Sequence, residues 1–528
     1  MREAIRKKLI PPNPLDRMIS FLSPVYGVKR MRARAVMALA SSYRGGDKSR
    51  RSLSEWGTSS GDADSDTLPE LDVLRDRSRD LVRNNPLATG AINTKVTHVV
   101  GTGIVLQSRI IRGALNLTED VADAWEKKTE YEWRLWSEST NCDVENTLSF
   151  TQIQELAFRS VLENGDVFVL LPLRDTGNPY RLQLQLIEAD RVCNADNVGD
   201  YVNDTGSLSG GIKRNKSGVP VEYHVLRGHP GNIFAENNVW DKIPAFGSKT
   251  GRKNVLHLFH KKRVGQTRGV PDLAPVIELI KQLGTYTESE AAAAVVNSFM
   301  AIFFKSEYDG GLNPMQPQTE IGGKTSDKAY KMGPAAMIDL FPNEDVVSVS
   351  PNRPNSAFDP FILAVTRQIG VALELPYEVL VKHFTASYSA ARAALLTAWH
   401  YFLGRRKWLV DGLCMPVYEL FLIEAVATGR IAAPGFLNDP LLKFAYLNSQ
   451  WTGPSKGQID EKKEIEAAEK RVALEVSTLS EETAALTGGD WEAKHAQRVK
   501  EINKQKADGT FKEVAPDEAM VQDPGEVE

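Results

Sequence analysis

The segment IGGKTS, residues 321–326, carries the residue types of a phosphate-binding loop. Such a loop cradles phosphate oxygens with backbone N–H groups, and it needs a glycine five residues before the glycine that precedes the lysine. With Gly323 in that second position, residue 318 is Gln, so the pattern fails. We therefore expect an ordinary turn here and no nucleotide hydrolysis.

Three other candidates for cofactor or metal chemistry are also incomplete. The Gly-Thr-Gly of residues 101–103 lacks the third glycine of a dinucleotide-binding turn, because residue 106 is Leu. His257 and His260 fall on opposite faces of one predicted strand. The three cysteines are far apart, with no pair at metal-ligand spacing. We expect no catalytic residue, no cofactor and no metal, and hence a protein that is not an enzyme.

A short loop is the remaining place where side chains could act on a partner. In ELPYEVLVKHFTASYSAARAALLTAW, residues 374–399, two helical patterns flank a piece without apolar periodicity. This piece carries Lys382, His383, Phe384, Thr385 and Ser387. It is small and slightly basic, and its composition alone does not say what it contacts. An ordinary interhelical turn with a solvated lysine is the alternative.

The charge of the chain is unevenly distributed. The 528 residues carry a net charge of −4, but residues 1–50 hold 12 Lys and Arg against 3 Asp and Glu. Residues 455–528 hold 11 basic against 18 acidic residues. The basic start could contact nucleic acid or an acidic neighbour, or be a solvated arm. With 42% hydrophobic residues, the chain is neither wholly disordered nor histone-like.

The sequence shows neither a predicted membrane span nor a secretory signal. No run of eighteen apolar residues predicts a membrane span, and the start, MREAIRKKLIPPNP, lacks the apolar core of a secretory signal. We expect a protein made in a reducing cytoplasm.

The first half of the chain predicts helices followed by a β-rich region. Residues 44–70 are rich in Gly, Ser and Asp and indicate a flexible linker. Amphipathic helices are expected at 68–85, with opposite charges on the wet face, and at 117–136, capped by Thr118. Residues 150–265 are expected to be mostly β, including a half-buried strand over 180–192.

The second half returns to helices. Val276, Ile280 and Leu283 form one stripe, and Phe358, Ile362, Val365 and Ile369 form another that needs a covering partner. Pro376 is expected to end the second helix. A long helix is predicted over 389–413, capped by Ser387 or Ser389, and the tail is expected to be helical pieces that fade after about Gly509.

Five phrases occur in the order seen in portal proteins of lambda-like tailed phages. They are RDRSRDLVRNNPLATGAINTKVTHVVGTGI (75–104), GGIKRNKSGVPVEYHV (210–225), HLFHKKRVGQTRGVPDLAPVIELI (257–280), SYSAARAALLTAWHYFLGRRKWLV (387–410) and WTGPSKGQIDEKKEIEAAEKR (451–471). The chain resembles that family from about Phe21 to about Trp491. One departure is Ala386, where the family pattern has a polar residue, usually Asn.

The resemblance implies an α+β portal fold with named parts. These are a basic arm and linker (1–70), a wing of helices followed by β structure (71–268), a stem helix (269–300), a clip (301–352), a second stem helix (353–375), a tunnel loop (376–388), a long wing helix (389–424), a helical crown (425–490) and an acidic tail (491–528). It assigns Lys382, His383, Phe384, Thr385 and Ser387 to the DNA channel.

The function implied by the resemblance is that of a conduit. Portal proteins form a ring, typically of twelve subunits, at one capsid vertex, through which double-stranded DNA enters during packaging and leaves during ejection. Their partners are the terminase large subunit, the capsid or scaffold protein and a head-completion neck protein, with no membrane involved. The expected locations are the virion and, during assembly, the host cytoplasm. A terminase-like packaging enzyme and a capsid adaptor that forms no ring are the alternatives.

Overall fold

The computed structural model divides the chain into two compact units, residues 1–62 and 63–528. The structure describes residues 13–39, 46, 51–58, 60–234, 239–298, 302–306, 344–348, 358–384, 387–457 and 461–511. The first unit contains helices α2 (Pro14–Leu22) and α3 (Pro24–Leu39). The segment 321–326 and most of the predicted clip lie outside the described residues.

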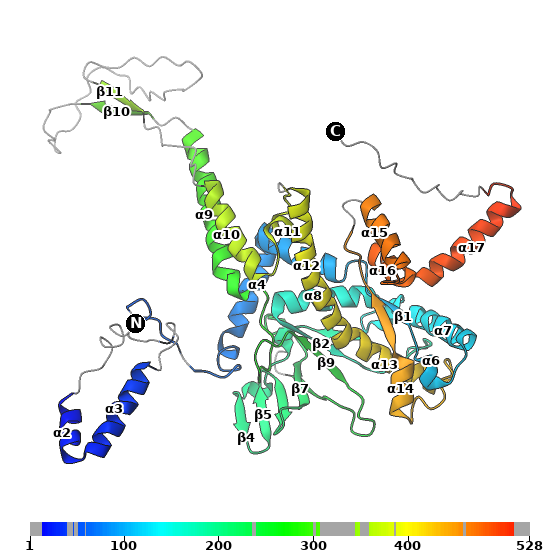
Figure 1. The fold of residues 1–528 in the computed structure, drawn as a ribbon, viewed down its shortest axis with the longest axis horizontal. Coiled ribbons are helices and arrows are strands. Elements are labelled where there is room, and N and C mark those ends of the chain that lie inside the picture. Colours follow the sequence, from blue (N-terminus) through cyan, green and yellow to red (C-terminus); the bar gives the residue numbers. More distant parts are fainter. Residues whose placement is uncertain are drawn as a thin grey trace, which may run out of the picture. The chain divides into compact units, whose positions relative to one another are not determined.

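The second unit mixes helices with small sheets, as the sequence predicts (Figure 1). Its α-helices are α4 (Leu71–Asn84), α5 (Pro86–Val99), α6 (Arg112–Leu115), α7 (Glu119–Ser137), α8 (Phe150–Asn164), α9 (Ile277–Ser298), α10 (Phe358–Ala372), α11 (Tyr377–Val381), α12 (Tyr388–Leu409), α13 (Met415–Ala427), α14 (Pro440–Leu447), α15 (Glu461–Ala473), α16 (Leu479–Thr487) and α17 (Trp491–Ala507). Short 3-10 turns are η2 (Leu68–Glu70), η3 (Thr140–Cys142), η4 (Ala189–Arg191), η5 (Ala195–Asn197) and η6 (Ala274–Val276).

The strands of the described residues form four small antiparallel sheets. They are β1 (Val105–Ser108), β2 (Asp166–Leu170), β3 (Gln185–Ile187), β4 (Tyr201–Asn203), β5 (Gly206–Ser209), β6 (Ile212–Asn215), β7 (Pro220–Leu226), β8 (Trp240–Pro244), β9 (Val255–Phe259), β10 (Ile302–Ser306), β11 (Glu344–Ser348) and β12 (Ser449–Thr452). The sheet orders are β3-β2-β9, the meander β4-β5-β6-β7-β8, and the pairs β1-β12 and β10-β11. In the β1-β12 pair, Leu106 lies opposite Trp451 and joins distant parts of the chain.

Helix α7 covers the edge of β1 that β12 does not pair with. The Glu130 carboxylate accepts a hydrogen bond from the backbone N–H of Ser108 at 2.8 Å, and Glu126 accepts one from Ile110 at 2.7 Å. Two glutamates four residues apart on one helix face thus satisfy strand donors that would otherwise be open to another strand.

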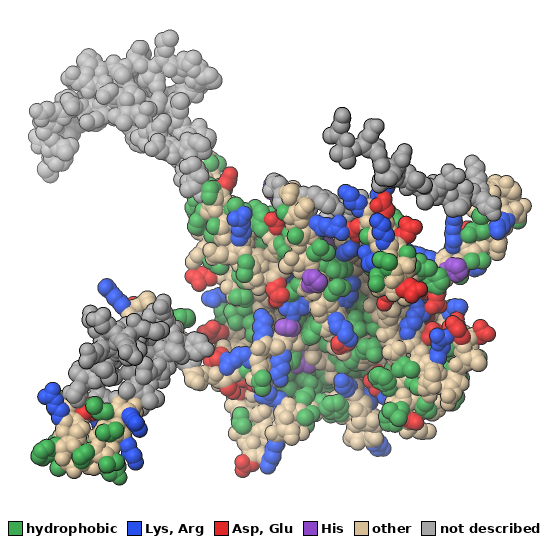
Figure 2. All heavy atoms as spheres, in the orientation of Figure 1, with side chains coloured by type: hydrophobic (Ala, Val, Ile, Leu, Met, Phe, Trp, Pro, Cys, Tyr) green, Lys and Arg blue, Asp and Glu red, His purple; other side chains and the backbone are tan. Residues whose placement is uncertain are grey.

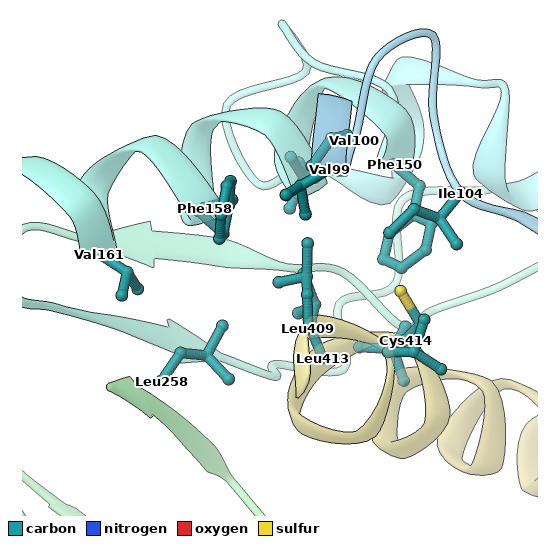
Figure 3. Close-up of a cluster of buried hydrophobic side chains, with 14 of the residues drawn as sticks. Val99, Val100, Ile104, Phe150, Phe158, Val161, Leu258, Leu409, Leu413 and Cys414 are labelled. Carbon is teal, nitrogen blue, oxygen red and sulfur yellow. The ribbon is translucent and has the colours of Figure 1, made fainter. Parts of the chain in front are cut away.

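The main core lies where α5, α8, β9 and the end of α12 meet. Val99, Phe158, Leu258 and Leu409 point toward one another there (Figure 3). Trp133 adds an aromatic centre, with edge-on contacts to Phe150, Tyr418 and Phe421, among others. Such edge-to-face pairs add to the free energy gained from burying apolar area.

Helices α9 and α10 pack side by side, as the two predicted apolar stripes require (Figure 1). Val276 and Ile280 on the first stripe and Ile369 on the second are buried. The Tyr286 and Phe358 rings stack with their centroids 5.6 Å apart. The second stripe is therefore largely covered within one chain, by α9 and the preceding turn η6.

The long helix predicted over 389–413 is interrupted near its end. Helix α12 runs to Leu409, a π-helical turn, η7 (Val410–Cys414), follows, and α13 continues from Met415. The prediction that Ser387 or Ser389 caps the helix is confirmed for Ser387, whose side chain accepts from the Ala390 N–H at 3.5 Å.

The β-rich region differs from the prediction in two respects. It begins with helix α8, which carries a capping box between Ser149 and Gln152, so its first strand starts only at Asp166. Within 180–192 the strand β3 takes only three residues, although Leu182 and Leu184 are fully buried as the alternation indicates. Gln183 is also buried, because its amide donates hydrogen bonds to the backbone oxygens of Asn141 and Asp143.

The linker and the first amphipathic helix are also more firmly attached than predicted. Asp64, in the predicted linker, accepts hydrogen bonds from the backbone N–H of Thr267 at 2.7 Å and from Arg214 at 3.1 Å. In α4, Arg75 is buried rather than exposed on a wet face. Helix α7 starts after Thr118 as expected, although the Thr118 side chain makes no capping hydrogen bond.

The last helices follow the predicted pattern. Helices α15, α16 and α17 occupy 461–507, and α17 ends close to Gly509. In the described part of the chain, no helix is both long and apolar enough to cross a membrane.

Candidate functional site

The predicted loop at 376–388 begins at a strongly constrained helix end. Helix α10 stops in a Schellman motif, in which Glu374 has a left-handed φ of 57° and the Leu375 N–H donates to the Gly370 oxygen at 2.9 Å. A Cβ on Gly370 would lie 2.6 Å from the Leu375 oxygen, so this close approach requires glycine. Pro376 follows and cannot continue the helix, as the sequence predicts.

The first half of the predicted loop is helical, which corrects the sequence interpretation. Residues 377–381 form α11, and its Val379 and Leu380 side chains are buried. Helix α11 packs against α5 and α12. The segment between α11 and α12 is therefore residues 382–387, about half the predicted length.

Lys382 and His383 end α11 in a second left-handed turn. Lys382 has φ 55°, and its N–H and that of His383 both point to the Glu378 oxygen, the latter at 3.2 Å. This backbone geometry is usually taken by Gly or Asn, since a Cβ is disfavoured there. Both side chains are exposed. Lysine at this position thus places a cation at the start of the loop.

Phe384 and Ser387 have different roles in the described structure. The Phe384 side chain is 50% exposed, so in a single chain it is not a core aromatic. Ser387 is the N-cap of α12, so its side chain stabilises the start of that helix. Thr385 lies outside the described residues.

A histidine from α5 lies near the loop and was not predicted. The pKa of His98 is lowered by burial and, to a smaller extent, by the positive charges of Lys382 and Arg406. The His98 ring stacks on Phe402 of α12 with centroids 4.8 Å apart. A neutral His98 therefore adds no positive charge beside the loop at neutral pH.

Helix α12, which follows the loop, has no acidic residue in its 22 positions. Its cations are nevertheless engaged in contacts within the chain. Arg392 lies 3.7 Å from Glu464, Arg405 lies 3.9 Å from Glu374, and Lys407 pairs with Asp411 at 2.6 Å. These charges are partly neutralised, which keeps the positive potential around the loop modest.

Arg406 holds three segments together. Its Nε donates to the Val99 oxygen at 3.0 Å, and its Nη2 donates to the oxygens of His98 and Pro454, both at 2.9 Å. Burial lowers the pKa of Arg406 to about 10, so it stays charged at neutral pH. A cation at the carboxyl end of α5 also complements the helix dipole. Arg406 thus anchors α12 to α5 and to the segment before α15.

A buried charge network, which the sequence did not indicate, joins the β-rich region to the base of α9. Asp166, fully buried at the start of β2, accepts from Arg268 Nε at 2.6 Å, from Arg75 at 3.1 Å and from the backbone N–H of Gly269 at 3.2 Å. His257 Nε2 lies 3.2 Å from the same carboxylate. Burial alone would raise the pKa of Asp166, but Arg268 and Arg75 outweigh it and hold this pKa far below its usual range. The network is structural: every group in it is occupied by another.

One cluster in the described residues has metal-ligand types. Ligand atoms of Glu188, Asp190 and His229 lie within 4.8 Å of one another. The Arg79 guanidinium, however, pairs with Asp190 and lies 3.4 Å from Glu188. A guanidinium already supplies the positive charge at this point, which argues against a metal ion.

The surface around these elements has mixed charge. Figure 2 shows Lys, Arg, Asp and Glu side chains interspersed over one face of residues 63–511. That face offers no extended basic track that would hold a polyanion tightly.

Comparison with known proteins identifies the family to which the chain belongs. A model of the lambda family of phage portal proteins matches residues 49–406, a span that includes α10, the loop and most of α12. The chain therefore belongs to the lambda family of phage portal proteins.

Individual relatives agree with this family. The chain is 28% identical over 479 residues to the portal protein of Escherichia phage N15, covering 87% of this chain and 89% of that protein. It is also 28% identical over 480 residues to portal protein B of Escherichia phage lambda, with 87% and 88% covered. A probable portal protein of Halomonas phage phiHAP-1 is 22% identical over 432 residues, with 80% and 79% covered.

Solved structures similar to the chain include the neck of a native gene transfer agent particle computed with C12 symmetry. The TM-score is 0.40 at 12% identity, with 78% of this chain and 93% of that chain covered. The neck of an empty particle computed with C6 symmetry gives a TM-score of 0.41 at the same identity, with the same shares covered.

Proposed function

We propose that copies of this protein form a closed ring of about twelve subunits at one capsid vertex, through which double-stranded DNA is packaged and ejected. The observation that carries the proposal is the family match over residues 49–406. Exposed apolar side chains on α10, among them Phe361 and Val371, offer a surface for contact with a neighbouring subunit.

In this ring the loop at 382–387 faces the channel and touches DNA without reading its sequence. Phosphate contacts position a duplex but carry no sequence information, and moving DNA presents every sequence in turn. One exposed lysine per copy, beside a half-exposed Phe384, suits a weak and reversible grip. Each additional phosphate contact would strengthen binding and oppose movement.

The parts of the family architecture map onto the chain as follows. The wing takes residues 71–268 and the long helix at 389–424, the stem takes 269–300 and 353–375, the clip takes 301–352, and the tunnel loop takes 376–388. The crown takes 425–490, between the arm at 1–70 and the tail at 491–528. With this layout, the buried network around Asp166 joins the wing to the base of the stem.

The partners of the ring follow from its position. It docks the terminase large subunit during packaging, contacts the capsid or scaffold protein, and afterwards receives a head-completion neck protein. It performs no catalysis itself, and its locations are the host cytoplasm during assembly and then the virion.

Electron microscopy of purified protein in negative stain tests the ring, and native mass spectrometry counts its subunits. Rings with a central hole are expected at micromolar concentration or after addition of scaffold protein. A protein that stays monomeric under both conditions would refute the ring and favour an adaptor.

A further inference from the structure

The helical hairpin of the first unit has its polar residues inside. Helices α2 and α3 meet where a Cβ on Gly27 would lie 2.3 Å from Ser20 Oγ, so their backbones approach closely. Beside this crossing, Asp16 is buried and accepts from Arg30 Nε at 2.9 Å. The seam between the two helices is therefore made of small and polar side chains.

The large apolar side chains of the hairpin point away from this seam. Eight of them in residues 13–33 are between 44 and 88% exposed: Leu15, Met18, Phe21, Leu22, Val25, Tyr26, Val28 and Met31. Leu15, Met18 and Leu22 share one face of α2, because they are three and seven residues apart. We call these eight side chains the outer apolar face.

Helices of this length need such a face to be covered. With 9 and 16 residues, α2 and α3 are near or below the length at which an isolated helix is stable in water. Most helical stability in proteins comes from packing an amphipathic face, and here the apolar face has nothing within its own hairpin to pack on.

The charges of the hairpin indicate what covers this face. Arg17, Lys29, Arg30 and Arg32 are exposed, whereas the one acidic residue, Asp16, is buried. A second copy of the hairpin would bring like charges together. DNA would pair with the charges but would leave the apolar side chains in water.

The position of Arg32 distinguishes a protein from a lipid surface. Arg32 lies four residues after Val28 and seven after Val25, and therefore in the middle of the apolar face of α3. A bilayer would desolvate this guanidinium without a partner, whereas a protein can place a carboxylate against it in a bidentate pair. We propose that the outer apolar face docks an acidic amphipathic helix of a different protein, with a carboxylate opposite Arg32.

The test uses the full-length protein and a fluorescently labelled acidic peptide, with leucines at helical spacing and glutamates elsewhere. Its matched control is a peptide of the same composition in shuffled order. Fluorescence anisotropy should show binding of the first peptide and not of the second. Arg32→Gln should weaken binding about tenfold or more, because it removes one member of a desolvated charge pair.

Two variants separate the proposal from general charge attraction and from unfolding. Arg17→Gln removes an equal charge beside the apolar face and should weaken binding less than about threefold. The triple change Leu15→Ser, Met18→Ser and Leu22→Ser should abolish binding without altering the polar seam.

Several results would overturn the proposal. Equal binding of the two peptides, or equal effects of the two arginine variants, would mean that only net charge matters. Binding to vesicles of phosphatidylglycerol and phosphatidylcholine but not to the peptide would identify a lipid surface instead. A change of subunit number in the triple variant would identify a second copy as the occupant.

Discussion

Replacing Asp166 by Asn should destabilise the protein severely, because it leaves the buried Arg268 without its anionic partner and removes a fully buried carboxylate from Arg75. Asn keeps the shape of the side chain but supplies one acceptor oxygen in place of two, and no charge. Breaking a buried pair from one side costs about 3–5 kcal/mol. For the unit 63–528, with an unfolding entropy of about 2.1 cal/mol/K per residue, this corresponds to a decrease in melting temperature of roughly 4 °C.

The matched control is Asp72→Asn, which removes a carboxylate from the same arginine. Asp72 lies 3.8 Å from Arg75, but its side chain is 91% exposed. Solvent screens such a pair, so this variant should change the free energy of unfolding by less than about 0.5 kcal/mol.

Urea unfolding, followed by the fluorescence of buried tryptophans such as Trp133 and Trp136, measures both variants. The pKa of Asp166 is depressed, so its contribution to stability is present above the unfolded value of 3.8 and is lost only as the pH falls below it. The difference between Asp166→Asn and wild type should therefore be constant from about pH 5 to pH 8. If the two variants unfold at the same urea concentration, the network does not hold the β-rich region to the base of α9.

Four further predictions concern the loop, the strand edge and the phosphate-loop-like segment. Lys382→Asn keeps the left-handed turn, since Asn tolerates positive φ, and should leave the melting temperature unchanged. It should reduce the number of DNA-filled heads equally for all DNA sequences. Normal filling of heads would place this lysine outside the channel. Phe384→Ala should lower head filling without lowering the melting temperature, because half of the ring is exposed; a loss of about 3 kcal/mol or more would instead identify a core aromatic. Burial raises the pKa of Glu126 and of Glu130, so the stability that these groups contribute is present below about pH 4.5 and is lost as the pH rises. The free energy of unfolding of the Glu126→Gln, Glu130→Gln double variant should therefore increase relative to that of wild type between about pH 5 and pH 7. A difference in free energy that does not change with pH would contradict the assigned burial. Purified protein should hydrolyse no ATP, and turnover that disappears in Lys324→Ala would contradict the reading of IGGKTS as a turn.

The elements that the sequence predicts well are those with one long apolar stripe. The stripe through Ile280 and the stripe through Ile369 each lead to one helix, α9 and α10, because burial on one face is a local, periodic signal. Pro376 and the Ser387 cap are local in the same sense. These features depend on few contacts outside their own segment.

What the sequence could not supply depends on contacts between distant residues. Arg75 was assigned to a wet face because nothing near it in sequence reveals a buried carboxylate 91 residues away. The alternation over 180–192 places Gln183 on the polar face of the strand, and nothing near it in sequence reveals the backbone oxygens of Asn141 and Asp143 that its amide reaches. Helix α11 was missed because five residues are too few for periodicity, although Val379 and Leu380 after Pro376 were a usable sign.

Arg406 anchors α12, and the buried face of α11 anchors that helix. These two anchors limit the distance over which the loop between the helices can move. Six residues, 382–387, can extend over about 20 Å at most, so the middle of the loop can travel only about 10 Å to either side of its anchors. A DNA strand advances about 3.4 Å per base. In the proposed ring, a loop tethered in this way would follow a moving duplex over about 20 Å, or about six base pairs, before releasing it, so a continuous hold on DNA would need several subunits that act out of step.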